Sequence, residues 1–200
     1  AIGAKPEFRF KITNNYGNVL RTKAAGSILG YSYKESYTQA EKPIFTRDIT
    51  VGENISKVTI FIDMPIEEYN KVTDLAVNIY DRSGKSVLGT GMSRKSRLVN
   101  FKPPAPGEYK LELVPAFLSK EIMAQEWNFS IEEKYHYSKT IAIVPEKPEM
   151  TIYPGINYDI KCTVDGAFPA VPDRCHTFGK FSLFNKNNED LIFKQLIYLE

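Results

Sequence analysis

The chain has 200 residues, a formal net charge of +2 and a hydrophobic fraction of 42%. This length suits one large domain or two small ones with a real core. The small net charge gives no electrostatic reason to expect binding to nucleic acid or to a membrane surface. No apolar run reaches the roughly 20 residues that a membrane-spanning helix needs. The N-terminal "AIGAKPEFRF" lacks the features of a signal peptide, so we expect a mature protein or a fragment without membrane insertion.

Strands are predicted throughout the chain because several segments alternate apolar and polar residues with a period of two. These segments are 7–12, 43–51, 57–64, 74–81, 107–117, 126–133 and 179–185. Turn sequences such as "NNYGN", "DRSGK" and "NKNNED" separate them, and helical turns are expected only near 66–72 and 118–125. The pattern predicts an all-β chain: a jelly-roll-like β-sandwich followed by a smaller β-sandwich-like module.

The boundary between the two modules is expected between Tyr137 and Lys147, at the start of a connector whose three prolines in "PEKPEMTIYP" should interrupt a strand ladder. We therefore expect the first sandwich at 31–137 and the smaller module at 138–200. Residues 1–30 form either an N-terminal lead-in to the first sandwich or a strand that the second module borrows.

Two histidines and two cysteines are the first candidates for chemistry. His136 and His176 lie outside any recognisable catalytic motif, so we expect both to be structural. Cys162 and Cys175 flank a loop that a disulfide would close in an oxidising compartment, contributing roughly 3 kcal/mol. In a reducing compartment the same residues would be two buried thiols. Two cysteines and one nearby histidine are too few for a structural zinc site.

The segment Val72–Gly89, "VTDLAVNIYDRSGKSVLG", predicts a hairpin with Gly84 in its turn. It is followed by "PPAPGEYKLELVPAF", a Pro-Gly corner that leads into another strand. This order of a T-D-L strand, a D-x-x-G-K turn and a P-x-P-G-x-Y-x-L-x-L strand resembles the non-catalytic jelly-roll and pre-peptidase-type domains of secreted subtilisin-like serine proteases. The resemblance covers roughly 31–137.

The resemblance implies a secreted, non-catalytic accessory region that stabilises a larger protease and helps it engage substrate or a surface. Its partners would be the catalytic domain of the same polypeptide, which would carry the Asp, His and Ser of the triad, and a protein substrate. Calcium is the cofactor that the resemblance implies. The acidic residues around the T-D-L strand are fewer here than in that family.

Asp63 and Asp74 are the candidate calcium ligands, because one ends an apolar strand and the other begins the next. Glu67 and Glu68 lie in the connection between them and would add carboxylate oxygens, which calcium prefers. The alternative is structural: aspartates at strand ends commonly cap turns through their own backbone.

A carbohydrate-binding or adhesive β-sandwich is the second hypothesis for function, because the chain holds 12 Tyr and 12 Phe in addition to Trp127. Trp127 alternates with Phe129 and Ile131, however, so the three share a face that we expect to fill the core. An enzyme in its own right is the third hypothesis.

Overall fold

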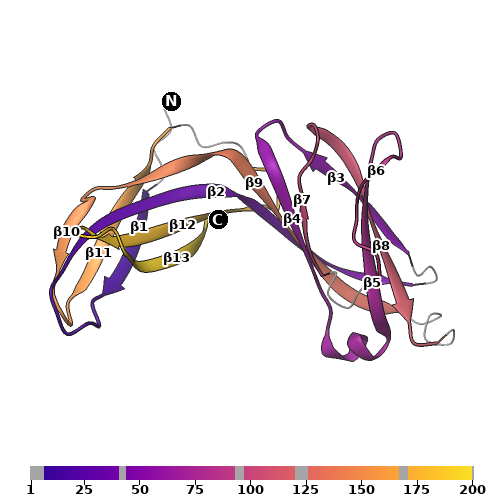
Figure 1. The fold of residues 1–200 in the computed structure, drawn as a ribbon, viewed down its shortest axis with the longest axis horizontal. Coiled ribbons are helices and arrows are strands. Elements are labelled where there is room, and N and C mark those ends of the chain that lie inside the picture. The colour runs from indigo at the N-terminus through magenta and orange to yellow at the C-terminus, as the bar shows by residue number, and fades with distance from the viewer. Residues whose placement is uncertain (1–6, 41–43, 93–96, 120–125, 167–170, 200) are drawn as a thin grey trace. The chain divides into compact units, whose positions relative to one another are not determined.

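The structure is a computed structural model that describes residues 7–40, 44–92, 97–119, 126–166 and 171–199. Within these ranges it is almost entirely β (Figure 1), which confirms the predicted all-β, sandwich-like class. No helix in the described ranges is long and apolar enough to cross a membrane. The strands are β1 Glu7–Thr13, β2 Leu20–Gln39, β3 Phe45–Val51, β4 Ile55–Asp63, β5 Val72–Asp81, β6 Ser86–Gly89, β7 Leu98–Phe101, β8 Gly107–Phe117, β9 Trp127–Pro145, β10 Glu149–Ile152, β11 Asn157–Val164, β12 His176–Asn185 and β13 Leu191–Leu199, with one 3₁₀ helix, η1, at Ile66–Asn70.

The chain divides into two compact units. One consists of residues 31–138, and the other combines 1–30 with 139–200. The long strands β2 and β9 each contribute one end to each unit.

The unit at 31–138 is a sandwich of two layers. One layer is a four-stranded sheet in the order β3-β8-β5-β6, and in the other β4 pairs with β7 and with β9, which neighbours β2. Aromatic contacts join the layers: the ring centroids of Phe45 and Phe129 are 5.0 Å apart, as are those of Phe101 and Tyr109. The core between the sheets is therefore built by the inward faces of strands from both layers.

Strand β9 shows why the sequence folds this way. Its buried positions alternate without interruption from Trp127 to Tyr137, so every second side chain faces the core. Trp127 is only 1% exposed and stacks on Phe129 at 4.2 Å, which confirms the prediction that it is a core residue and not a surface platform.

The second unit contains a single sheet in the order β1-β11-β9-β2-β12-β13, with β10 paired to β2. Strand β1 pairs with β11 in antiparallel register from Glu7↔Thr163 to Thr13↔Asn157. Phe10 of β1 nevertheless stacks on Phe181 of β12, at 4.2 Å between ring centroids, although three strands separate β1 from β12 in the sheet. The sheet must therefore curl so that its inner face closes on itself.

The predictions for the connector and for the helical turns can be compared with the structure. Strand β9 continues past Tyr137, but its last residue is Pro145, which pairs with Cys162, and Pro148 and Pro154 lie in the gaps before and after β10. Pro145 is tolerated in β9 because a strand end does not need its N–H in the ladder. The helical turn near 66–72 is confirmed as η1, whereas most of the one expected at 118–125 lies outside the described residues.

The close approach of β12 to β2 generates a testable prediction at Gly179. A Cβ atom at this position would lie 2.5 Å from the carbonyl oxygen of Ser27 and 3.2 Å from the Cα of Ile28. Because both neighbours are backbone atoms, Gly179→Ala should lower the free energy of unfolding by about 1–3 kcal/mol.

Gly17 provides the matched control, since a Cβ atom there would meet nothing within 4 Å. Gly17→Ala should change stability by less than about 0.5 kcal/mol. Urea denaturation of both variants tests the difference, and equal stability of the two would contradict the close packing of β12 on β2.

Candidate functional site

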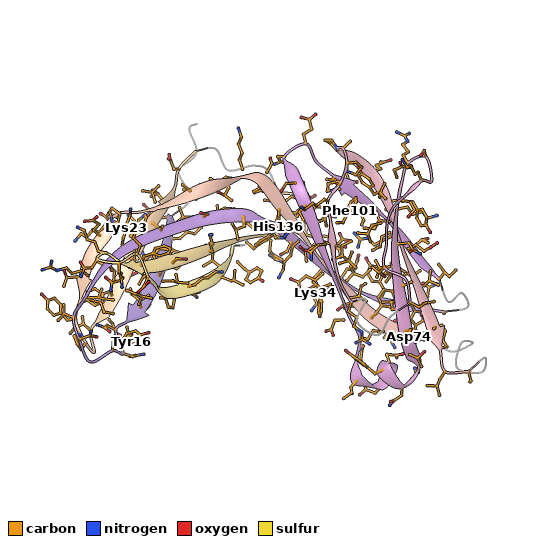
Figure 2. All side chains as sticks on the ribbon, viewed as in Figure 1. Tyr16, Lys23, Lys34, Asp74, Phe101 and His136 are labelled. Atoms are coloured by element: carbon orange, nitrogen blue, oxygen red, sulfur yellow. The ribbon has the colours of Figure 1, made fainter. Side chains whose placement is uncertain are left out.

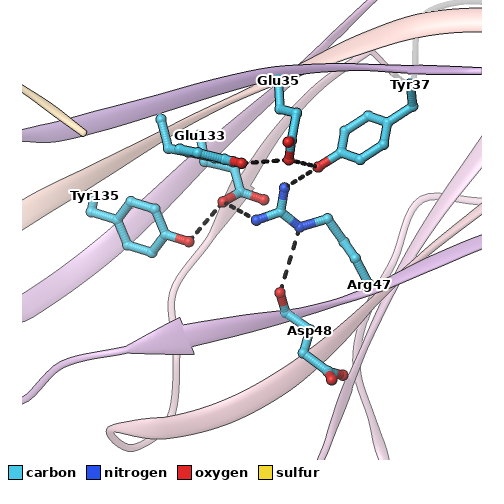
Figure 3. Close-up of polar contacts among 7 residues, drawn as sticks. Glu35, Tyr37, Arg47, Asp48, Glu133 and Tyr135 are labelled. Carbon is cyan, nitrogen blue, oxygen red and sulfur yellow. Dashed lines mark hydrogen bonds and ion pairs between the residues drawn. The ribbon is translucent and has the colours of Figure 1, made fainter. Parts of the chain in front are cut away.

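A cluster of hydrogen-bonded polar side chains lies in the sandwich where β2, β3 and β9 meet (Figure 3). Strand β2 contributes three side chains at every second position, Tyr33, Glu35 and Tyr37. Strand β9 contributes Glu133 and Tyr135, and β3 contributes Arg47. We call these six residues the Arg47 network.

Strand alternation places Arg47 and Glu133 on inward faces. Arg47 is in phase with the buried Phe45 and Ile49 of β3. Glu133 continues the buried series of β9, and none of its surface is exposed. The sequence analysis did not single out either residue. The signal that could have found them is an opposite charge on the apolar phase of each of two predicted strands.

Arg47 joins the two sheets of the sandwich. Its Nη2 donates to Oε2 of Glu133 at 3.2 Å, and its Nη1 donates to the hydroxyl of Tyr37 at 2.6 Å. Tyr135 also donates to Oε2 of Glu133, at 2.7 Å. Because β3 belongs to one layer and β9 to the other, the ion pair links the layers.

Glu35 gathers the tyrosines of β2. The hydroxyl of Tyr37 donates to Oε2 of Glu35 at 2.7 Å, and Tyr33 donates to the same oxygen. The guanidinium of Arg47 also lies over the ring of Tyr33, at 5.2 Å from its centroid, in the geometry of a cation–π contact. Arg47 therefore contacts Glu133 directly and is connected to Glu35 through the hydroxyl of Tyr37.

Burial sets the electrostatics of the network. It raises the pKa of Glu133 above the ordinary value for glutamate, although Arg47 and Tyr135 oppose the shift. Burial and the nearby carboxylates also raise the pKa of Tyr37 and of Tyr135, so both phenols stay neutral at neutral pH. Burial lowers the pKa of Arg47, but Glu133, Tyr37 and Tyr135 together outweigh it, and the net shift of the pKa is upward. Arg47 and Glu133 therefore stabilise each other in their charged forms.

The buried carboxylate of Glu133 is only partly satisfied. Oε2 accepts two hydrogen bonds, whereas Oε1 has no hydrogen-bond partner among the described residues. An unpartnered buried oxygen adds to the cost of keeping this group ionised. The pairing with Arg47 is therefore the main compensation for the buried negative charge.

The two histidines belong to different units. His136 lies on the outward side of β9, where its Nε2 is 3.1 Å from the hydroxyl of Thr59. Partial burial, together with Lys57 and Lys134, lowers the pKa of His136 (labelled in Figure 2). His176 is the exposed first residue of β12 in the other unit.

The predicted calcium ligands Asp63 and Asp74 lie in different layers of the sandwich. Asp63 is the exposed last residue of β4, and Asp74 (Figure 2) is half-buried in β5 opposite Ala116 of β8. Glu68, expected to help them, is instead buried in η1, where Lys71 and Asn128 each donate to its Oε1 at 3.2 Å. Among the described residues no three His, Cys, Asp or Glu side chains gather in a metal-binding group. Calcium binding stays a prediction.

The predicted disulfide between Cys162 and Cys175 is not formed in this structure. The thiol of Cys162 points into the core from β11, and burial raises its pKa to about 11. Cys175 lies in the turn that precedes β12 and is only partly buried. In the sheet, β9 and β2 lie between β11 and β12, so the short sequence separation of the cysteines does not make their strands neighbours.

The Arg47 network generates a prediction that depends on pH. Arg47→Met removes the cation and leaves Glu133 charged and buried, which should lower the free energy of unfolding by about 3–5 kcal/mol at pH 7. Without Arg47 the folded-state pKa of Glu133 rises further. Between the pKa of Glu133 in the unfolded chain, about 4.3, and its higher pKa in the folded variant, the folded state binds more protons than the unfolded state. The free energy of unfolding of the variant therefore falls as pH rises through this range. The deficit should therefore shrink toward pH 4, as measured by urea denaturation across pH.

Two further variants control this experiment. Arg47→Met combined with Glu133→Leu should recover most of the lost stability, because neither charge is then left buried alone. Arg9→Met removes an exposed ion pair in which the nitrogen and oxygen are 3.6 Å apart, and should cost at most about 1 kcal/mol. A deficit for Arg47→Met that is small, or unchanged between pH 7 and pH 4, would contradict the electrostatic account.

Comparisons with known proteins do not assign the chain to a family. No family model and no curated protein matches it. Among solved structures it is similar to a β-glucuronidase from Ruminococcus gnavus in complex with uronic isofagomine, at 5% identity and a TM-score of 0.27. That match covers 78% of this chain and 34% of the glucuronidase chain, so this chain spans about a third of its length. A TM-score this low does not establish a shared fold.

Proposed function

We propose that this chain is a non-catalytic accessory region of a larger, secreted subtilisin-like serine protease. In this role the sandwich at 31–138 stabilises the parent enzyme, and the chain as a whole helps it to engage a protein substrate or a surface. The catalytic domain of the same polypeptide is its first partner. The catalytic Asp, His and Ser lie on that domain.

The observation that supports this proposal most strongly is the arrangement of the segments that carry the resemblance. The T-D-L strand is β5, the strand after the D-x-x-G-K turn is β6, and the P-G-x-Y segment opens β8. Strand β5 lies between the other two, paired antiparallel with both. The motif pieces therefore form one continuous part of a sheet, as expected of a structural signature of a domain.

The turn in this signature is also structural. The side-chain Oδ1 of Asp81 accepts hydrogen bonds from the backbone N–H groups of Ser83 at 2.9 Å and Lys85 at 3.0 Å. These bonds lower the pKa of Asp81, with the hydroxyl of Ser83 as the largest cause. Gly84 has a φ of 82°, a conformation that glycine adopts without strain. The motif residues Asp81 and Gly84 thus stabilise the turn between β5 and β6.

The Arg47 network fits the same role. Its charged groups are engaged with each other inside the core, and the pKa values of Tyr37 and Tyr135 are shifted away from those of proton acceptors at neutral pH. Such a network gives two sheets a fixed register, a property suited to a domain that stabilises a neighbour.

The coding region around this chain tests the proposal directly. We expect the same reading frame to encode a subtilisin-type catalytic domain, with its Asp, His and Ser motifs, upstream of Ala1. A complete reading frame without a protease domain would contradict the proposal.

A carbohydrate-binding module is the second candidate, favoured by exposed aromatic rings on two neighbouring loops. Tyr16 and Tyr153 are 58% and 54% exposed. The loops that carry them are joined by a hydrogen bond from the N–H of Gly155 to the carbonyl of Asn14, at 2.9 Å. Exposed rings of this kind stack on sugars. Specific oligosaccharide binding that is lost in Tyr16→Ala, with no protease in the reading frame, would favour this candidate.

A further inference from the structure

The unit formed by 1–30 and 139–200 contains a cleft at its surface. Its volume is about 430 Å³, within the range of roughly 300–1,000 Å³ typical of ligand-binding clefts. It lies between β1 and β13, the two outermost strands of the sheet. Among the described residues, β1 pairs only with β11, and β13 pairs only with β12. The cleft is therefore flanked by two strands that each have an unpaired edge.

The lining of the cleft combines an apolar floor with a polar rim. The floor is formed by Ile12, Leu20, Ile152, Leu183, Ile192 and Phe193. Exposed side chains at the rim include Lys11, Asn15 and Tyr16, the last of which lies in the turn between β1 and β2 (Figure 2). Asn14 also lines the cleft, but it is buried and holds this turn by donating to the carbonyls of Asn18 and Ile152. The cleft thus suits an apolar group attached to a polar chain.

The two edge strands differ in how they are protected. Strand β1 presents the exposed charges Glu7, Arg9 and Lys11, and such charges discourage pairing with another strand. Strand β13, "LIFKQLIYL", has one charged residue and no proline. Its Leu191 and Leu196 are 54% and 57% exposed. A long, apolar, unpaired edge is the kind of strand that accepts another strand.

We propose that the cleft binds an extended peptide segment, which adds to β13 as a further strand and places apolar side chains on the cleft floor. In an extended segment every second side chain points to the same face. Alternating apolar residues would therefore enter the cleft while their polar neighbours face solvent. Backbone hydrogen bonds to the free edge of β13 hold the segment, and the floor selects its side chains.

The positive charge of Lys11 at the rim indicates which end of the peptide should be acidic. Glu7 is paired with Lys161 at 2.8 Å and Arg9 with Asp159 at 3.6 Å, whereas Lys11 has no ion-pair partner among the described residues. A carboxylate beside the first apolar residue of the peptide would supply that partner. The preferred segment is therefore acidic at one end and alternates apolar and polar residues.

The geometry favours a single segment over the other occupants. A second copy of this chain would present a strand that is already paired on one side in its own sheet. An oligosaccharide would place hydroxyl groups against the apolar floor, where they would lose hydrogen bonds to water. Peptide binding at this cleft does not require that the chain belong to a protease, so it can be tested independently of the reading frame.

The test measures binding of a fluorescein-labelled peptide, Asp-Val-Ser-Val-Ser-Val-Ser-Gly, to the 200-residue chain by fluorescence anisotropy. We expect saturable binding. Lys11→Glu should weaken it about tenfold and should favour the analogue with Lys in place of Asp. Lys102→Glu makes the same charge change at an exposed site in the other unit and should have no effect. Thermal unfolding verifies that both variants are folded.

Backbone methylation separates strand addition from simple apolar contact. The peptide is N-methylated either on all valines or on all serines, and the form whose N–H groups face β13 should lose binding. Equal binding of both methylated forms and the parent peptide would overturn the proposal. So would no binding of the parent peptide at millimolar concentration, or binding that is unchanged by Lys11→Glu. Concentration-dependent dimers that mask the peptide site, or oligosaccharide binding that competes with the peptide, would assign the cleft to another occupant.

Discussion

The pairing of the buried charge of Glu133 with Arg47 is the electrostatic constraint that the core of the sandwich must satisfy. Glu133 is completely buried on the same face of β9 as Trp127 and Phe129, so its negative charge must be compensated inside the core. Arg47 supplies that compensation from β3, a strand of the opposite sheet. Apolar contacts alone would tolerate small shifts of one sheet over the other. The ion pair does not, because a shift would separate the charges in a region of low dielectric constant.

The unit formed by 1–30 and 139–200 has a single sheet, with β1 and β13 as its outermost strands. Its sheet curls so that Phe10 and Phe181 stack, yet among the described residues its two outermost strands, β1 and β13, each pair on one side only. The charges on β1 protect one edge, whereas the exposed leucines of β13 leave the other available. The unit at 31–138 thus uses the Arg47 network inside its sandwich. The other unit has an apolar cleft and the exposed edge of β13 at its surface. In the proposed accessory region, the first unit would supply stability and the second a binding site.

Much of the fold could be predicted because strand formation is governed by local alternation. Strand β8 at Gly107–Phe117 matches its predicted range, and β5 begins two residues before the predicted start. The 20 residues of β2 were not predicted as a strand. Around Gly26 and Ser27 the regular alternation of buried and exposed positions lapses, and pairing with β9 and β12 maintains the strand there. Strand β9 likewise passes through three consecutive exposed residues after Tyr137, where the sequence suggested a boundary.

The candidate site could be predicted only in part. The sequence contains the charges on the inward phases of β3 and β9, but it does not reveal which strands face each other across the core. The same limit explains the cysteines. The separation of Cys162 from Cys175 along the chain carries no information about the strands that lie between them in the sheet. Side-chain phase is a local property of the sequence, whereas strand neighbours are set by the tertiary structure.

The pKa of Glu133, measured by NMR titration of its ¹³C-labelled side-chain carboxyl group, tests the account of the sandwich most directly. The account predicts a folded-state pKa above the ordinary glutamate value of about 4.3, and a titration that also perturbs the side-chain resonances of Arg47 and Tyr135. A carboxyl group that titrates at the ordinary value, without a response from Arg47 or Tyr135, would contradict it.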